Sequence, residues 1–224
     1  MEKIVVANLK MNLEENDIKE YLSVIKDFDN KNIDFYVAPS YIYLNEFLSR
    51  NYHLTAQNVS CNIDGAYTGE ISSIQLKSIG VDSVIIGHSE RRNIFNEDYK
   101  IINEKVIHSL NQDLKVILCI GEKNENDLNA MFEELDKDLK NANLDNIIIA
   151  YEPEYSIGTG VSASITHIKN VTKKIKEKYN VKVIYGGSVD EENIAEICRI
   201  TDGVIIGKMS LNAPRLLNMM KKIA

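Results

Sequence analysis

The chain has 224 residues, of which 44% are hydrophobic and 26% charged, a balance typical of a soluble globular protein. Its 33 Asp and Glu outnumber its 26 Lys and Arg, and the formal net charge of −7 argues against general nucleic-acid binding while permitting a local anion site. The N-terminal apolar run is too short for a signal peptide, and no segment approaches the roughly 18 apolar residues of a membrane span. We therefore expect a cytoplasmic protein with neither a nucleic-acid nor a membrane partner.

The three cysteines, Cys61, Cys119 and Cys198, are an odd number without C-x-x-C spacing. Cys119 falls inside the apolar run VILCI, where a cysteine behaves as a small buried hydrophobe. We expect reduced cysteines and no structural metal.

Short apolar runs rich in Val and Ile recur along the chain. Such uninterrupted runs are typical of strands buried on both faces, as in a parallel sheet. In chain order, the predicted strands span residues 4–7, 35–38, 54–57, 83–86, 115–120, 147–150, 182–185 and 203–206.

Between the runs lie segments whose apolar residues recur near helical spacing, as Ile18, Leu22, Ile25 and Phe28 do in the first of them. The last segment has Pro near its start and two lysines in its final turn, a typical helix signature. The predicted helices span residues 17–28, 97–111, 127–141, 164–179, 191–200 and 214–223.

Eight strands in this length leave about 28 residues per unit, enough for a strand, a loop and a helix. No linker, low-complexity tract or internal repeat interrupts the alternation. We predict an α/β fold, a (β/α)₈ TIM barrel of eight parallel strands with outer helices, forming a single domain over residues 1–224. An open doubly-wound sheet has the same alternation and stays possible on the pattern alone.

Catalytic groups of a barrel lie at the carboxyl ends of its strands, so polar residues that directly follow the apolar runs are the candidates. They are Asn8, Lys10, Gln57, Asn58, His88, Glu90, Gly121, Glu122, Glu152, Gly186, Gly187, Ser188, Gly207 and Lys208. The other histidines, His53, His108 and His167, have no comparable setting.

Three of these candidates suggest specific chemistry. Glu152 ends a buried strand, and partial desolvation there raises the pKa of a carboxyl and makes it a better base. A helix beginning after His88 points backbone N–H groups at the imidazole and favours the neutral ring, which still donates one hydrogen bond. Lys10 supplies a positive charge for an anion. Each also has a plain structural reading: a capping or ion-paired glutamate, a locally satisfied histidine and a surface lysine.

Glycine-bearing loops follow the seventh and eighth strands, as YGGSV at 185–189 and GVIIGKMS at 203–210. Barrels often bind phosphate at these positions through loop amides and a short helix N-terminus. The segment IGTG at 157–160 follows Glu152, and its glycines permit either a mobile lid or an ordinary turn.

Taken together, these segments resemble the triosephosphate isomerase family across essentially the whole chain. The matching segments are NLKMN, AQNV, GAYTGEIS, IIGHSERR, CIGE, AYEP, IGTG, YGGSV and DGVIIG, of which GHSERR and the AYEP…IGTG pair are highly specific. The resemblance implies a cofactor-free isomerase of glycolysis and gluconeogenesis. Such an enzyme interconverts dihydroxyacetone phosphate and D-glyceraldehyde 3-phosphate through an enediol(ate), and the barrel follows from the family as well.

The resemblance also assigns roles. Glu152 is the base that moves a proton between C1 and C2, and His88 is the neutral electrophile. Lys10 holds the anionic substrate and Asn8 orients it. The supporting residues are Glu90, Ser89 and Tyr185. The phosphate-binding residues are Gly158, Ser188, Gly207 and Lys208.

A lid is implied over residues 153–160, held shut by Tyr185 and Ser188. An enediol phosphate readily expels phosphate in water, so the lid must exclude water while gripping the phosphate. The lid residues are Pro153, Glu154, Tyr155, Ser156, Ile157, Gly158, Thr159 and Gly160.

In the family, a loop after the third strand inserts into a second subunit, so we expect a homodimer; a solvent-exposed loop is the alternative. The corresponding residues are Tyr67, Thr68, Gly69 and Glu70.

The chain departs from the family at three points. It is shorter than a typical barrel of about 250 residues, a deficit we assign to peripheral helices and loops. Glu154 and Tyr155 stand where an aliphatic residue and Trp are common. Gly207-Lys208 stands where the family has Gly-Gly, and we expect this replacement to alter phosphate affinity without abolishing activity.

Two other functions fit a barrel with these loops. A pentose-phosphate epimerase usually needs metal ligands inside the barrel, and no matching His/Asp set is present. A binding or scaffold homologue would have no chemical need for the set Asn8, Lys10, His88, Glu90 and Glu152. We therefore favour the isomerase.

Overall fold

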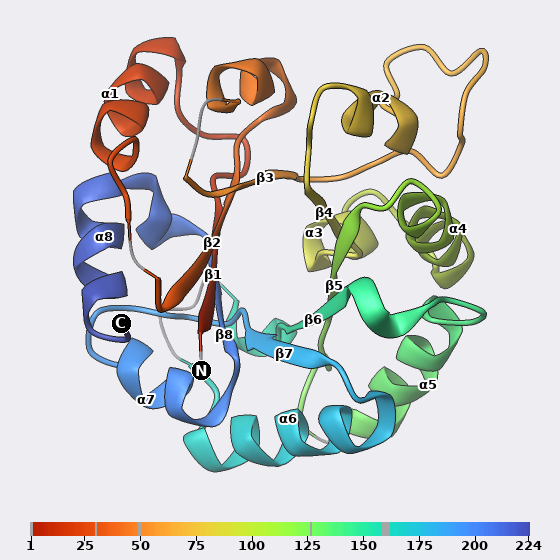
Figure 1. The fold of residues 1–224 in the computed structure, drawn as a ribbon. Coiled ribbons are helices and arrows are strands. Elements are labelled where there is room, and N and C mark those ends of the chain that lie inside the picture. Colours follow the sequence, from red (N-terminus) through yellow and green to blue (C-terminus); the bar gives the residue numbers. More distant parts are fainter. Residues whose placement is uncertain (1, 30, 49–50, 126, 158–161) are drawn as a thin grey trace.

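The computed structural model describes residues 2–29, 31–48, 51–125, 127–157 and 162–224. Eight parallel strands hydrogen-bond in chain order, and the first pairs with both the second and the eighth, so the sheet closes into a barrel (Figure 1). The strands are β1 Lys3–Asn8, β2 Ile33–Ala38, β3 His53–Ala56, β4 Ser83–Ile86, β5 Lys115–Ile120, β6 Ile147–Tyr151, β7 Lys182–Tyr185 and β8 Gly203–Ile206. The predicted (β/α)₈ barrel is confirmed, and an open doubly-wound sheet is excluded.

Strands β4, β5, β7 and β8 match their predicted bounds at both ends. The others differ by one or two residues at one or both ends. Strands β1, β2 and β6 are longer because pairing with the neighbour continues past the apolar run, whereas β3 begins one residue earlier and ends at Ala56, before the predicted Gln57. In β1, for example, Lys3 pairs with Ile33 and Asn8 pairs with Ala38.

Helices surround the barrel (Figure 1). The α-helices are α1 Glu15–Ile25, α2 Ser73–Ser78, α3 Ser89–Asn93, α4 Tyr99–Leu110, α5 Leu128–Asp138, α6 Ile165–Tyr179, α7 Ile194–Ile200 and α8 Ala213–Lys221. The 3₁₀ helices are η1 Tyr41–Phe47, η2 Leu144–Asn146, η3 Glu154–Ser156 and η4 Lys208–Leu211. All six helices predicted from periodicity are present, mostly shorter than expected.

The short helix α2 was not predicted, because six residues give too little periodicity. Its signal is a capping box, in which the Ser72 side chain accepts from the N–H of Gln75 and the Gln75 side chain accepts from the N–H of Ser72. Between β2 and β3 the connection is the 3₁₀ helix η1 rather than an α-helix. The reduced second and third units agree with the expected shortening of peripheral elements.

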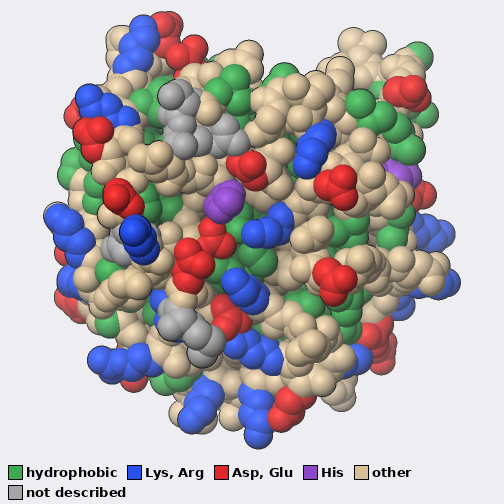
Figure 2. All heavy atoms as spheres, viewed as in Figure 1, with side chains coloured by type: hydrophobic (Ala, Val, Ile, Leu, Met, Phe, Trp, Pro, Cys, Tyr) green, Lys and Arg blue, Asp and Glu red, His purple; other side chains and the backbone are tan. Residues whose placement is uncertain are grey.

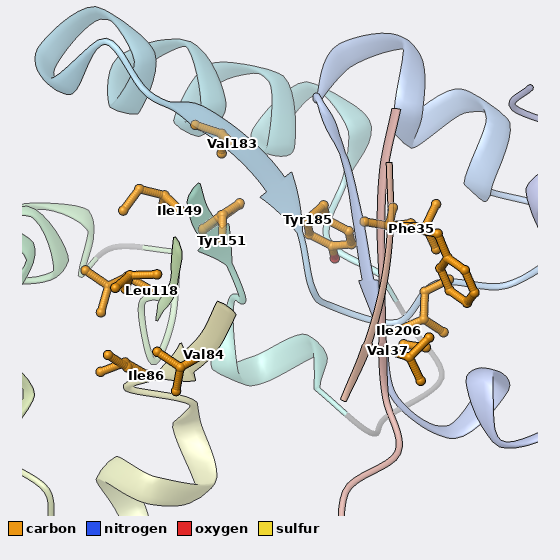
Figure 3. Packing of buried hydrophobic residues seen from close by; sticks show 14 of the residues in the cluster. Phe35, Val37, Val84, Ile86, Leu118, Ile149, Tyr151, Val183, Tyr185 and Ile206 are labelled. Atoms are coloured by element: carbon orange, nitrogen blue, oxygen red, sulfur yellow. The ribbon is translucent and has the colours of Figure 1, made fainter. Parts of the chain in front are cut away.

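Strand residues alternate between two cores. In β1, Ile4 and Val6 point into the barrel interior, whereas Val5 and Ala7 face the outer helices. Figure 3 shows part of the outer core, with side chains contributed by β2, β4, β5, β6, β7 and β8. Burial on both faces explains why the strands are nearly continuous apolar runs. Cys119 lies in the interior cluster and is fully buried, as predicted.

Acidic and basic side chains are interspersed over the face seen in Figure 2. None of the helices in the described part of the chain has the length and apolar character that a membrane span requires.

Candidate active site

A cavity of about 780 Å³ opens at the carboxyl ends of the strands. It gathers residues that follow β1, β4, β6, β7 and β8, which is where a barrel concentrates its chemistry. Among the predicted site residues, those that line it are Asn8, Lys10, His88, Glu152, Ile157, Gly186, Gly187, Ser188, Gly207 and Lys208. The structure therefore brings together groups that are up to 200 residues apart in the sequence.

Glu152 is the buried carboxylate of this cavity. It directly follows β6, its side chain is 3% exposed, and its N–H donates to the Ile120 carbonyl at 2.8 Å. Burial raises the pKa of Glu152 above the ordinary carboxyl value, and the neighbouring His88 and Lys10 offset only part of that rise. A carboxylate that is costly to keep ionised has a strong tendency to take a proton, as a general base must.

His88 faces Glu152 across the cavity, with His88 Nε2 lying 3.7 Å from Glu152 Oε2. Helix α3 begins at the next residue, and the N–H of Glu90 donates to His88 Nδ1 at 3.2 Å. A ring nitrogen that accepts a hydrogen bond carries no proton, so the neutral ring has its proton on Nε2. This is the helix position and the ring orientation expected from the sequence.

Lys10 supplies the ammonium group. Its backbone has φ +50°, and its carbonyl oxygen accepts from Ser40 Oγ at 3.0 Å and from Gln57 Nε2 at 2.9 Å. Its Nζ lies 2.6 Å from Glu90 Oε1. Burial alone would raise the pKa of Glu90, but the hydrogen bond from Lys10, the nearby His88 ring and the charge of Lys10 hold that pKa below the ordinary value. Glu90 is therefore placed to hold the ammonium beside the cavity.

The turn after β8 forms one wall. A Cβ atom placed on Gly207 would lie 3.3 Å from Lys10 Cε, so the backbone here closely approaches the lysine. The exposed Lys208 starts η4 and lines the same cavity. The cavity is also lined by polar residues that were not predicted as site residues, among them Asn12, Asp190 and Arg215 in the first turn of α8. Arg215 reaches the cavity because the short η4 connects β8 directly to α8.

The described part of the expected lid is residues 153–157, which include η3. Ser188 Oγ donates to the Ser156 carbonyl at 2.8 Å, and Tyr185 Oη accepts from the N–H of Ala163 at 3.0 Å. Tyr185 and Ser188 thus contact the segments on either side of residues 158–161. The predicted residues Gly158, Thr159 and Gly160 lie outside the described residues.

The two lid departures have their own partners. Glu154 accepts from Asn93 Nδ2 at 2.9 Å, and Tyr155 Oη lies 3.5 Å from Glu125 Oε1. Both side chains are therefore engaged by neighbours outside the set that lines the cavity.

The expected dimer loop lies apart from the cavity. Residues between β3 and α2 extend beyond the ring of helices in Figure 1. Within this segment Tyr67 is 49% exposed, Gly69 has φ +94°, and the N–H of Glu70 donates to the Tyr67 carbonyl at 3.0 Å. The described residues hold no group of three or more His, Cys, Asp or Glu side chains placed to bind a metal ion.

Comparison with known proteins gives a consistent result. The sequence model of the family described as Triosephosphate isomerase matches residues 3–223. Proteins named triosephosphate isomerase from Alkaliphilus oremlandii and Campylobacter concisus are 38% and 39% identical to the chain, covering 96% of it and 97% and 96% of those proteins. A protein of the same name from Mycoplasma genitalium is 34% identical, with 99% of each chain covered. The chain belongs to the triosephosphate isomerase family.

Proposed function

We propose that this protein interconverts dihydroxyacetone phosphate and D-glyceraldehyde 3-phosphate, with Glu152, His88 and Lys10 as the catalytic residues. These are the roles known for the family. One observation carries the proposal: a single cavity is lined by the buried carboxylate of Glu152, by the imidazole of His88 with its Nε2 3.7 Å from that carboxylate, and by Lys10.

The chemistry follows from that geometry. Glu152 removes a proton from C1 of the ketose and returns it to C2, so its raised pKa favours the transfer. The hydroxyl proton on O1 moves to O2 in the same interval, so that C1 becomes the aldehyde and C2 carries the hydroxyl. The Nε2–H of His88 donates to the oxygen that gains negative charge in the enediolate, and the ammonium of Lys10 stabilises the same charge. Asn8 lines the cavity beside Lys10 and orients the substrate, while Glu90 holds Lys10 in place.

The remaining assignments are proposals of the same kind. Ser188 and Gly207 donate backbone N–H groups to the phosphate together with Gly158, and Lys208 adds a positive charge at the rim. Residues 153–160 form a lid that excludes water from the intermediate. No cofactor or metal enters the reaction. We further propose a single domain over residues 1–224, a homodimer through residues 67–70, and a cytoplasmic role in glycolysis and gluconeogenesis.

A coupled isomerase assay in both directions tests the proposal, with wild type compared to Glu152→Ala. We expect the variant to lose about 10³-fold or more in kcat, because the general base is removed. Folding of the variant is checked by urea unfolding. A wild-type protein inactive with both triose phosphates would refute the isomerase and favour a binding role, and sedimentation velocity separates the proposed dimer from a monomer.

A further inference from the structure

A buried hydrogen-bonded cluster lies behind the base, outside the set of described residues that line the cavity. It consists of Glu122, Tyr151 and His167. Tyr151 Oη donates to Glu122 Oε1 at 2.7 Å, and His167 Nε2 lies 2.8 Å from the same oxygen. The side chain of Glu122 is fully buried, that of His167 is 15% exposed, and Tyr151 is buried. No catalytic step uses these three residues, although Tyr151 immediately precedes the base.

The backbone of Glu122 is joined to the backbone that carries the base. The N–H of Glu154 donates to the Glu122 carbonyl at 3.0 Å, and the N–H of Glu152 donates to the Ile120 carbonyl at 2.8 Å. Gly121 lies between these two bonds. A Cβ atom on Gly121 would lie 1.8 Å from the Glu152 carbonyl oxygen, so the backbone at Gly121 is in direct contact with the backbone at Glu152. A displacement of Glu122 must therefore displace Glu152.

The position of Glu122 depends on its two donors. Its second oxygen, Oε2, has no hydrogen-bond partner among the described residues, so Oε1 receives both bonds. A buried carboxylate that loses a donor bears a large desolvation cost and shifts toward any polar group or water within reach. Tyr151 belongs to the barrel wall, and His167 belongs to the first turn of α6, where its N–H donates to Ser164 Oγ at 3.2 Å. Helix α6 also favours a negative charge at this end.

We propose that His167 is a positioning residue for the base: through its hydrogen bond to Glu122 it fixes the turn that carries Glu152. The helix α6 thereby anchors the strand ends of β5 and β6 to each other from outside the cavity. This role rests on the proposed function, since it concerns the placement of the isomerase base.

The test compares His167→Leu, which removes the donor, with His167→Gln, whose amide reaches about as far as Nε2 and keeps it. We expect kcat to fall about tenfold or more in His167→Leu, because a shift of a fraction of an ångström at the base has effects of this order. KM should change less than twofold, since His167 itself does not line the cavity and the phosphate-binding residues proposed above are not altered. His167→Gln should recover kcat to within about threefold of wild type.

The matched control is His53→Leu. His53 Nε2 lies 2.9 Å from Asp34 Oδ1, and β3 starts at His53, so this histidine–carboxylate pair lies at the opposite end of the barrel. Its loss should lower the free energy of unfolding with less than a twofold change in kcat. If His167→Leu does not fold, Tyr151→Phe removes the other donor to Glu122 and should lower kcat in the same way.

Two results would overturn the role of His167. The first is an unchanged kcat in His167→Leu or, if that variant does not fold, in Tyr151→Phe. The second is a loss of kcat in His167→Gln as large as the loss in His167→Leu. Wild-type activity distinguishes these failures from failure of the isomerase assignment itself. An inactive wild type would contradict the proposed function, whereas an active wild type with unaffected variants would contradict only the positioning role.

Discussion

Gly186, the first residue after β7, packs directly against the proposed base Glu152, and replacing it by Ala should displace that carboxylate. A Cβ atom at this position would lie 2.5 Å from Glu152 Cγ, 2.8 Å from Glu152 Oε1 and 2.6 Å from Ile205 Cγ2. Carbon atoms in contact are about 3.5–4.0 Å apart, so the carboxylate must move by about 1 Å. The backbone of Gly186 lies outside the left-handed region, so the obstacle is the neighbouring side chains and not the backbone conformation.

We expect Gly186→Ala to lower kcat about 10²-fold, the size of effect that a 1 Å misplacement of a catalytic group produces. Overpacking should lower the free energy of unfolding by about 1–3 kcal/mol. The coupled isomerase assay measures the first quantity and urea unfolding the second.

Gly80→Ala is the control for lost stability. Gly80 has φ +83°, and its nearest contact for a Cβ atom is Leu48 Cδ2 at 4.0 Å, far from the cavity lining. Its backbone strain should cost about 1–2 kcal/mol without changing kcat. A folded Gly186→Ala protein with kcat within about threefold of wild type would refute the steric reasoning.

Three further outcomes follow from the site. Because the raised pKa of Glu152 favours the protonated form in the folded protein, its stabilising contribution is present at low pH and lost as pH rises through that pKa. Glu152→Gln should therefore increase the free energy of unfolding by about 1 kcal/mol or more at pH 8 but not at pH 4. Urea unfolding at the two pH values measures this difference, and equal effects at both would show that the carboxyl is not desolvated. Lys208→Gly should raise KM for dihydroxyacetone phosphate about two- to fivefold, as expected for one exposed charge beside an anion, and an unchanged KM would exclude a role for Lys208. Arg92→Lys should cost about 3 kcal/mol in unfolding free energy, because Arg92 binds the Gly87 carbonyl at 2.7 Å and Asp138 at 2.7 Å together; a thermal midpoint equal to wild type would contradict this.

The barrel could be predicted because each of its strands is buried on both faces. A run such as VILCI in β5 has no polar side chains to place in solvent, as expected for a strand covered on both faces, so its composition indicates a buried strand. The ends of the strands were less accessible, since Lys3 and His53 belong to strands through backbone pairing and not through their side chains.

The proposed catalytic side chains could be predicted from the sequence for a related reason. Glu152, His88 and Lys10 each follow a strand closely, and the closed barrel brings those strand ends to one cavity. Contacts made behind that cavity could not be predicted from the sequence, because they join residues that are distant in sequence and follow no shared pattern. His167 bonds to Glu122 across 45 positions, and Arg92 bonds to Asp138 across 46.

The proposed base, Glu152, is held from two sides by groups that take no part in the proton transfer. On one side Gly186 leaves no space between β7 and the carboxylate, and on the other Gly121 and Glu122 contact the backbone that carries it. A desolvated carboxylate gains solvation free energy by turning toward water. The burial that raises the pKa of Glu152 therefore also favours movement of its carboxylate out of the buried position. Rigid contacts on both sides are therefore required to keep a strong base in place. It follows that Gly186→Ala and His167→Leu, which disturb opposite sides, should both act on kcat more than on KM.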